Sequence, residues 1–167
     1  MEKEINIAKN KNLLKVSSLI SLGGSILMIA SMFLPFIVGG PSIMPSNSMV
    51  SYVQLSLEQG AKYMGTNAFG ILMLCIVGFI GLFAFLAFVL SCTKKPIGII
   101  VFTALASLVF FVLCGDFRSR DVISDSGFKW GIGYYVFIIG AVVSLGGAVF
   151  MIVQKNIIKK GEKINEE

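Results

Sequence analysis

Four stretches of the chain are apolar over a length that can cross a bilayer, and none contains a charged residue. They are residues 16–38, 68–92, 97–114 and 132–153. A helix needs about 20 mostly apolar residues to span the hydrocarbon core. Charged residues make up only 14% of the chain, well below the roughly 25% of an average soluble domain. The sequence therefore predicts an all-α integral membrane protein, a single domain over 1–167 in which four transmembrane helices form an antiparallel bundle.

The connections between these stretches differ in length. The turn 93–96 is too short to cross a membrane, so its two flanking helices are expected to form a hairpin. Residues 39–67 make a long first outer loop, and residues 115–131 a shorter second one. The apolar spacing within 50–64 fits both a short strand and an amphipathic helix on the membrane surface. We favour the helix, because Ser48 can cap its start and Gly60 can end it.

The first apolar stretch also follows a basic start, as a signal peptide does. It is longer than a usual signal-peptide core, and it lacks a small-residue cleavage site and a lipobox cysteine. We therefore expect an uncleaved membrane helix. Pro35 lies near its far end, where a helix stop is tolerated best.

Basic residues are distributed unequally between the two sides of this topology. Of the 14 lysine and arginine residues, ten fall in the termini or the turn 93–96, and four in the outer loops. Positive charge is retained on the cytoplasmic side, which predicts that both termini and the turn are cytoplasmic. The lysine-, isoleucine- and asparagine-rich ends are typical of proteins from bacteria with AT-rich genomes. The expected location is a bacterial plasma membrane.

The first and last helices carry small residues at a common spacing. The alternating intervals of three and four predict that they pack antiparallel along these faces, because small residues let helix backbones approach closely in lipid. The small residues expected at this contact are Ser17, Ser21, Gly24, Ser31, Gly133, Gly140, Ser144 and Gly147. The hairpin of the second and third helices is expected to complete the bundle.

Residue types that carry chemistry are scarce. The chain has no histidine and no C-x-x-C pair, and no ionisable acid or base lies within the four stretches. These features argue against zinc and haem sites, thiol redox chemistry and proton-coupled transport. Cys75, Cys92 and Cys114 are expected to be packing residues. We predict no catalytic, cofactor-binding or metal-binding residues, and the membrane-flanking lysines do not form a nucleic-acid-binding face.

The second outer loop is the best candidate for a binding site. It holds three charges of each sign, which we interpret as a possible partner-binding loop formed by Asp116, Arg118, Arg120, Asp121, Asp125 and Lys129. The aromatic residues Trp130, Tyr134 and Tyr135 follow, as expected for anchors at a membrane interface.

The order of a long outer loop, a tight inner turn and a shorter outer loop resembles that of claudin-type tetraspan proteins. The resemblance implies the topology alone. The first outer loop lacks the paired cysteines and the tryptophan motif of claudins, so no activity is carried over.

These features predict a non-enzymatic multi-pass protein that acts through its outer loops. It would contact the lipid bilayer and bind a protein partner in the membrane or at the cell surface, as an accessory or immunity-type factor. The alternative is a self-associating channel- or holin-like protein, a homo-oligomer in which the serine face of the first helix lines a lumen.

Overall fold

The computed structural model describes residues 2–39, 46–63, 67–119, 123 and 127–163. Four helical segments in this part of the chain are long and apolar enough to cross a membrane. They are Asn12–Ser31 within α1 (Glu2–Ser31), α3 (Ala68–Cys92), α4 (Pro96–Ser119) and Ile132–Lys160 within α5 (Ile132–Lys163). Their length and composition are those of a multi-pass membrane protein.

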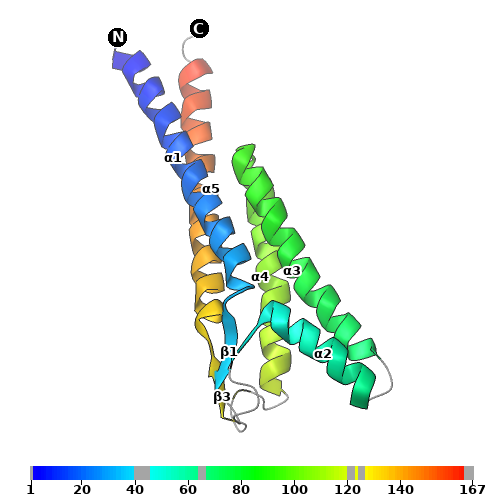
Figure 1. Ribbon diagram of the computed structural model, residues 1–167. Coiled ribbons are helices and arrows are strands. Elements are labelled where there is room, and N and C mark those ends of the chain that lie inside the picture. The colour runs from blue at the N-terminus through cyan, green and yellow to red at the C-terminus, as the bar shows by residue number, and fades with distance from the viewer. Residues whose placement is uncertain (1, 40–45, 64–66, 120–122, 124–126, 164–167) are drawn as a thin grey trace.

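The long helices lie side by side in two pairs (Figure 1). Helices α1 and α5 run in opposite directions and make the most extensive contact between any two elements. Helices α3 and α4 form the second pair, joined by the turn after Cys92. Both chain ends lie at the same end of the molecule as this turn, and the short strands and α2 lie at the opposite end (Figure 1).

Helix α1 is displaced from the predicted span 16–38. It begins at Glu2 and ends at Ser31, and Pro35–Gly39 form strand β1. The prediction of helix up to residue 38 is therefore wrong. Proline lacks the N–H that a helix needs and disfavours helical geometry in the residue before it. The N–H groups of Met32, Phe33 and Leu34 close short turns at 3.1–3.3 Å before the chain extends.

A three-stranded sheet was not part of the sequence prediction. Strand β1 lies between β2 (Ser46–Ser48) and β3 (Phe128–Trp130), and both pairings are antiparallel. Pro35 lies opposite Ser48, and Ile37 lies opposite Trp130. The sheet therefore joins the two segments that precede α3 and α5.

The first connecting segment contains the helix that the sequence analysis favoured over a strand, α2 (Met49–Tyr63). The hydroxyl oxygen of Ser48 accepts a hydrogen bond from the Ser51 N–H at 3.1 Å, as a helix cap does. The expected end at Gly60 is wrong, because α2 continues to Tyr63. Glycine inside a helix costs only about 1 kcal/mol. A Cβ added to Gly70 of α3 would lie 2.7 Å from the Leu57 Cα, which shows how closely α2 lies on α3.

Helices α4 and α5 extend beyond their predicted ends at 114 and 153. The last turns of α4 bury Phe117 on the same face as Leu113. Helix α5 continues to Lys163, and Gln154, just beyond the predicted end, is buried. Hydropathy indicates where a helix leaves lipid, whereas both helices continue past that point and bury Phe117 and Gln154 there.

Each long helix buries a stripe in which the intervals of three and four residues alternate. Helix α3 buries Gly70, Met73, Val77, Ile80, Ala84, Ala87 and Ser91. The corresponding stripe of α4 comprises Pro96, Ile99, Thr103, Ala106, Phe110, Leu113 and Phe117. This is the spacing of helices that cross at a small left-handed angle. Large apolar residues fill the outward positions, as expected where lipid replaces water as solvent.

Candidate functional site

The end of the molecule opposite the chain termini carries a packed unit, here called the outer cap, which consists of β1, β2, β3, α2 and the last turns of α4. Phe36 of β1 lies at its centre and is 1% exposed. The Phe36 ring lies with its centroid 5.8 Å from those of Phe110 and Phe117, and 5.3 Å from the Trp130 ring. Such ring pairs contribute about 0.5–1.5 kcal/mol each beyond their buried area. The cap therefore connects β1 to α4 and β3 through side chains as well as through the sheet.

The cap is joined to α5 through backbone contacts. The Gly131 N–H donates to the Phe36 carbonyl oxygen at 2.8 Å. A Cβ added to Gly131 would overlap the Pro35 carbonyl group, and one added to Gly133 would lie 2.8 Å from the Ser31 carbonyl oxygen. Only glycine lets the end of α1 and the start of β1 lie directly on this part of α5.

The three aromatic residues predicted to be interface anchors have different environments. The Trp130 and Tyr134 rings stack at 4.7 Å with an interplanar angle of 19°. Tyr134 also lies 5.7 Å from Phe110, so both rings belong to the packed cap. Tyr135 is 55% exposed, and its role as an anchor at the membrane interface stays a prediction.

The charged residues of the predicted partner-binding loop do not form one loop. Asp116 and Arg118 belong to the end of α4, where Arg118 is exposed. Lys129 is exposed on β3. Arg120, Asp121 and Asp125 lie outside the described residues. The loop expected from 115 onward is thus replaced in part by a longer helix and a strand.

The small residues predicted at the contact of the first and last helices are all buried, and the glycines, Ser21 and Ser144 lie directly at it. A Cβ added to Gly24 would lie 2.6 Å from the Gly140 carbonyl oxygen, and one added to Gly147 would lie 2.5 Å from the Ser21 nitrogen. The hydroxyls of Ser17 and Ser31 donate to carbonyl oxygens of their own helix, those of Leu14 and Met28. The contact is therefore one of backbone against backbone.

Six buried hydroxyl groups join all four long helices, and we call them the hydroxyl cluster. They belong to Ser18, Ser21 and Ser25 of α1, Ser91 of α3, Thr103 of α4 and Ser144 of α5. Ser18 donates to the Ser91 carbonyl oxygen at 2.8 Å, and the Ser21 and Ser91 hydroxyls are 3.2 Å apart. Ser144 Oγ lies 3.3 Å from Ser25 Oγ and 3.1 Å from Thr103 Oγ1.

Ser18, Ser25, Ser91 and Thr103 were not predicted from the sequence. The available signal was a hydroxyl residue inside an apolar stretch, but its partners are distant in sequence. Neutral hydroxyls bonded to one another stabilise helix contacts in lipid by roughly 0.6–2 kcal/mol per bond. No group of three histidine, cysteine, aspartate or glutamate side chains suited to a metal ion occurs among the described residues. The cluster has the chemistry of a structural contact.

Cys75 and Cys92 are exposed, and Cys114 is buried in the core. Gln154 is 5% exposed, and its Oε1 has no hydrogen-bond partner in the described part of the chain. Its amide group is therefore a buried polar group on α5 that takes no part in the hydroxyl cluster or the outer cap.

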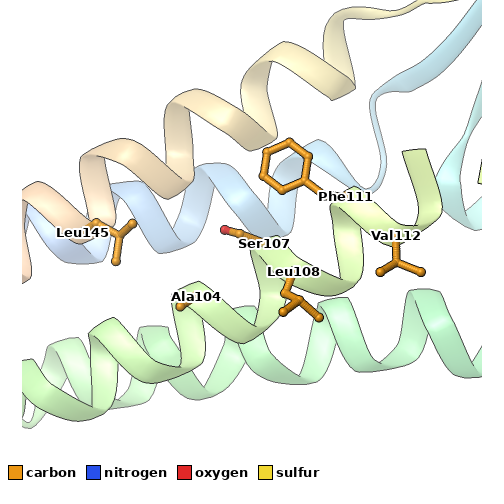
Figure 2. Close-up of a pocket in the computed structure, with 6 residues that line it drawn as sticks. All are labelled: Ala104, Ser107, Leu108, Phe111, Val112 and Leu145. Carbon is orange, nitrogen blue, oxygen red and sulfur yellow. The ribbon is translucent and has the colours of Figure 1, made fainter. Parts of the chain in front are cut away.

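A shallow groove lies between α4 and α5. Its volume is about 640 Å³, and it is lined by Ala104, Ser107, Leu108, Phe111, Val112 and Leu145. Figure 2 shows Ser107 and Phe111 on the side of α4 that faces α5, with Leu145 on the other wall. The Ser107 hydroxyl donates to the Thr103 carbonyl oxygen of its own helix at 2.8 Å. The groove is thus an apolar surface that suits a lipid acyl chain or the apolar side chains of another helix.

The fold and the site together define a class of protein, a multi-pass membrane protein with a packed cap at one end of its helices. The chain matches no protein-family model, no curated protein and no solved structure.

Proposed function

We propose that this protein is a non-enzymatic component of a plasma membrane whose outer cap is the binding surface. In this proposal the cap binds another membrane or cell-surface component, and the protein serves as an accessory subunit or an immunity-type factor. The observation that carries the proposal is the antiparallel pairing of β1 with β3. It unites two segments that are distant in sequence into one surface.

A surface that is ordered before binding loses less conformational entropy when it binds. The cap has this property, because Phe36 is buried among aromatic rings of α4 and β3. Strand β3 is also at an edge of the sheet, since the strand order is β2-β1-β3. An edge strand offers backbone donors and acceptors to an additional strand from a partner. Exposed Lys129 on β3 adds a positive charge to this edge.

The proposed orientation places the cap outside the cell and both termini in the cytoplasm. Lys94 and Lys95 lie in the turn after Cys92, and the Lys155 ammonium group donates to the Lys94 carbonyl oxygen. Lys159 and Lys160 follow on the last turns of α5, and Lys15 lies near the start of the apolar segment of α1. Basic residues of short connections favour the cytoplasmic side. A reporter fused to the C-terminus should therefore be active only inside a bacterial cell, and activity restricted to the outside would contradict the orientation.

The alternative of a channel-like protein is supported less well. A lumen lined by the serine face of α1 requires these hydroxyls to face water. Ser17, Ser21 and Ser31 are instead buried, and Ser21 is hydrogen-bonded to Ser91 and to the Ser144 carbonyl oxygen. A pore on this face would have to break the contact between α1 and α5.

The test uses a photoreactive amino acid at position 129 of the full chain, expressed in the cells from which the gene comes. The proposal expects a stoichiometric cross-link to one membrane or surface protein. The matched control carries the probe at Lys160, which is exposed at the opposite end of the molecule. The same cross-link from both positions, or none from position 129, would count against the cap as the binding surface. Ion flux through liposomes that contain the purified protein would favour the channel alternative instead.

A further inference from the structure

A pocket lies at the end of the molecule opposite the outer cap, where the α3–α4 turn meets α5. Its volume is about 340 Å³, and it is lined by Leu90, Lys95, Pro96, Ile97, Gly98 and Lys155. Two of these side chains are cationic and the other four residues are apolar. No carboxylate is among the described residues that line it.

The turn that forms the pocket has a defined geometry. The Lys94 N–H donates to the Ser91 carbonyl oxygen at 3.2 Å, and the Lys95 N–H donates to the Leu90 carbonyl oxygen at 3.0 Å. Lys94 has a positive φ of 55°. These are the bonds and the left-handed residue of a Schellman motif. The motif fixes the backbone of Lys95 directly before Pro96, the first residue of α4.

Lys155 of α5 is attached to the same turn. Its ammonium group donates to the Lys94 carbonyl oxygen at 2.6 Å. An ammonium group has three N–H donors, so two remain for another acceptor. Because Lys95 of the α3–α4 turn lines the same pocket, two positive charges, one from this turn and one from α5, are available to one anion.

The apolar part of the pocket continues toward the membrane-spanning parts of α3 and α4. Ile97 is 72% exposed, and Leu90 forms the adjoining wall. A Cβ added to Gly98 would lie 2.7 Å from Leu90 Cδ1, so the absence of a side chain at Gly98 leaves room for Leu90 in this wall. Cationic groups beside exposed apolar residues at the end of a membrane span match the two parts of a phospholipid, an anionic headgroup and an acyl chain.

We propose that this pocket binds one anionic phospholipid of the adjacent leaflet, with its phosphate between Lys95 and Lys155 and an acyl chain along Leu90 and Ile97. The site joins the α3–α4 hairpin to α5, so a bound lipid stabilises the contact between the two helix pairs. The inference is independent of the proposed partner binding, because it concerns the opposite end of the molecule.

The test measures thermal unfolding of the purified full-length chain in a neutral detergent during titration with phosphatidylglycerol or phosphatidylcholine. Phosphatidylglycerol should raise the unfolding temperature at a lower concentration than phosphatidylcholine does. Equal responses to the two lipids would overturn the proposal, and this comparison needs no variant. Inorganic phosphate is the third titrant. A response to phosphate equal to that of the lipid would also overturn it, because the acyl chain would then play no part.

Lys95→Gln removes one charge and leaves the Lys155–Lys94 hydrogen bond in place. The half-maximal concentration of phosphatidylglycerol should rise roughly fivefold, as expected for loss of one lysine contact with an anionic headgroup. The matched control is Lys159→Gln with Lys160→Gln, which removes two exposed lysines of α5 that do not line the pocket. This control should keep the wild-type half-maximal concentration. An equal loss in the control would show general charge attraction and overturn the site.

Discussion

Gly24 of α1 and Gly140 of α5 face each other backbone to backbone. A Cβ added to Gly24 would lie 2.6 Å from the Gly140 carbonyl oxygen, and a Cβ added to Gly140 would lie 2.8 Å from the Gly24 carbonyl oxygen. Neither neighbour is the flexible end of a side chain, so neither can move without shifting a helix. The distance between α1 and α5 is therefore set by the absence of side chains at these two positions.

Gly24→Ala should lower the free energy of unfolding by about 1–3 kcal/mol, the usual cost of forcing an extra group into a packed contact. Gly23→Ala is the matched control on the same helix, because a Cβ at Gly23 meets nothing within 4 Å. The control should be neutral or stabilising, since alanine favours a helix by up to about 1 kcal/mol over glycine. Thermal unfolding in detergent measures both variants. Equal effects of the two substitutions would show that the α1–α5 contact is not close.

Ser144→Ala should loosen the centre of the four helices. Its hydroxyl lies within hydrogen-bond distance of both Ser25 Oγ and Thr103 Oγ1. At roughly 0.6–2 kcal/mol per bond in lipid, loss of the two bonds should lower the unfolding free energy by about 1–4 kcal/mol.

Ser107→Ala is the control for that substitution, because the Ser107 hydroxyl donates only within α4, to the Thr103 carbonyl oxygen. It should change stability by less than Ser144→Ala does. A double-mutant cycle between Ser144→Ala and Thr103→Val measures the coupling directly, and a coupling of zero would contradict the bond between them.

The sequence was sufficient to predict four membrane-spanning helices, because each consists of an uninterrupted apolar stretch. It also indicated the face of α5 that holds Gly140 and Gly147, since small residues stand out among large ones. The buried stripes of α3 and α4 were not predictable in this way. Val77 and Ile80 are buried, whereas the neighbouring Phe79 is 51% exposed. In lipid the buried and exposed positions are equally apolar, so composition does not distinguish them.

The outer cap was predicted in part. The apolar periodicity of this segment fitted a strand as well as a helix, and helix α2 was favoured because Ser48 could cap its start, which is a local signal. The sheet was not predicted, because β1 pairs with a strand that begins almost 90 residues later, at Phe128. The end of α1 before Pro35 was also missed. The sequence stays apolar to residue 38. The chain forms a strand instead of helix at Pro35–Gly39 because β2 and β3 pair with it there.

Lys94→Gly should stabilise the turn between α3 and α4. Lys94 has a φ of 55°, a left-handed conformation that costs a residue with a Cβ about 1–2 kcal/mol. Glycine adopts it freely but loses more entropy on folding, so the expected net gain in unfolding free energy is at most about 1 kcal/mol. Lys94→Val should have the opposite effect, because β-branched residues tolerate positive φ least. Thermal unfolding of both variants provides the measurement, and a valine variant as stable as the glycine variant would contradict the left-handed turn.

Phe36→Ala should open the outer cap while the long helices stay folded. The Phe36 ring is buried among Phe110, Phe117 and Trp130, and removing a buried phenylalanine ring costs about 3–5 kcal/mol. The cap contains short strands that depend on this ring for cohesion, whereas the α1–α5 contact involves other residues. Amide hydrogen exchange should therefore become faster in β1 and β3 and remain slow in the middle of α5, with little change in helical circular dichroism.

Phe33→Ala removes a ring of the same size that is 67% exposed, and it should leave exchange in the cap unchanged. Uniformly faster exchange throughout the Phe36→Ala variant would show instead that the cap and the helices unfold as one cooperative unit.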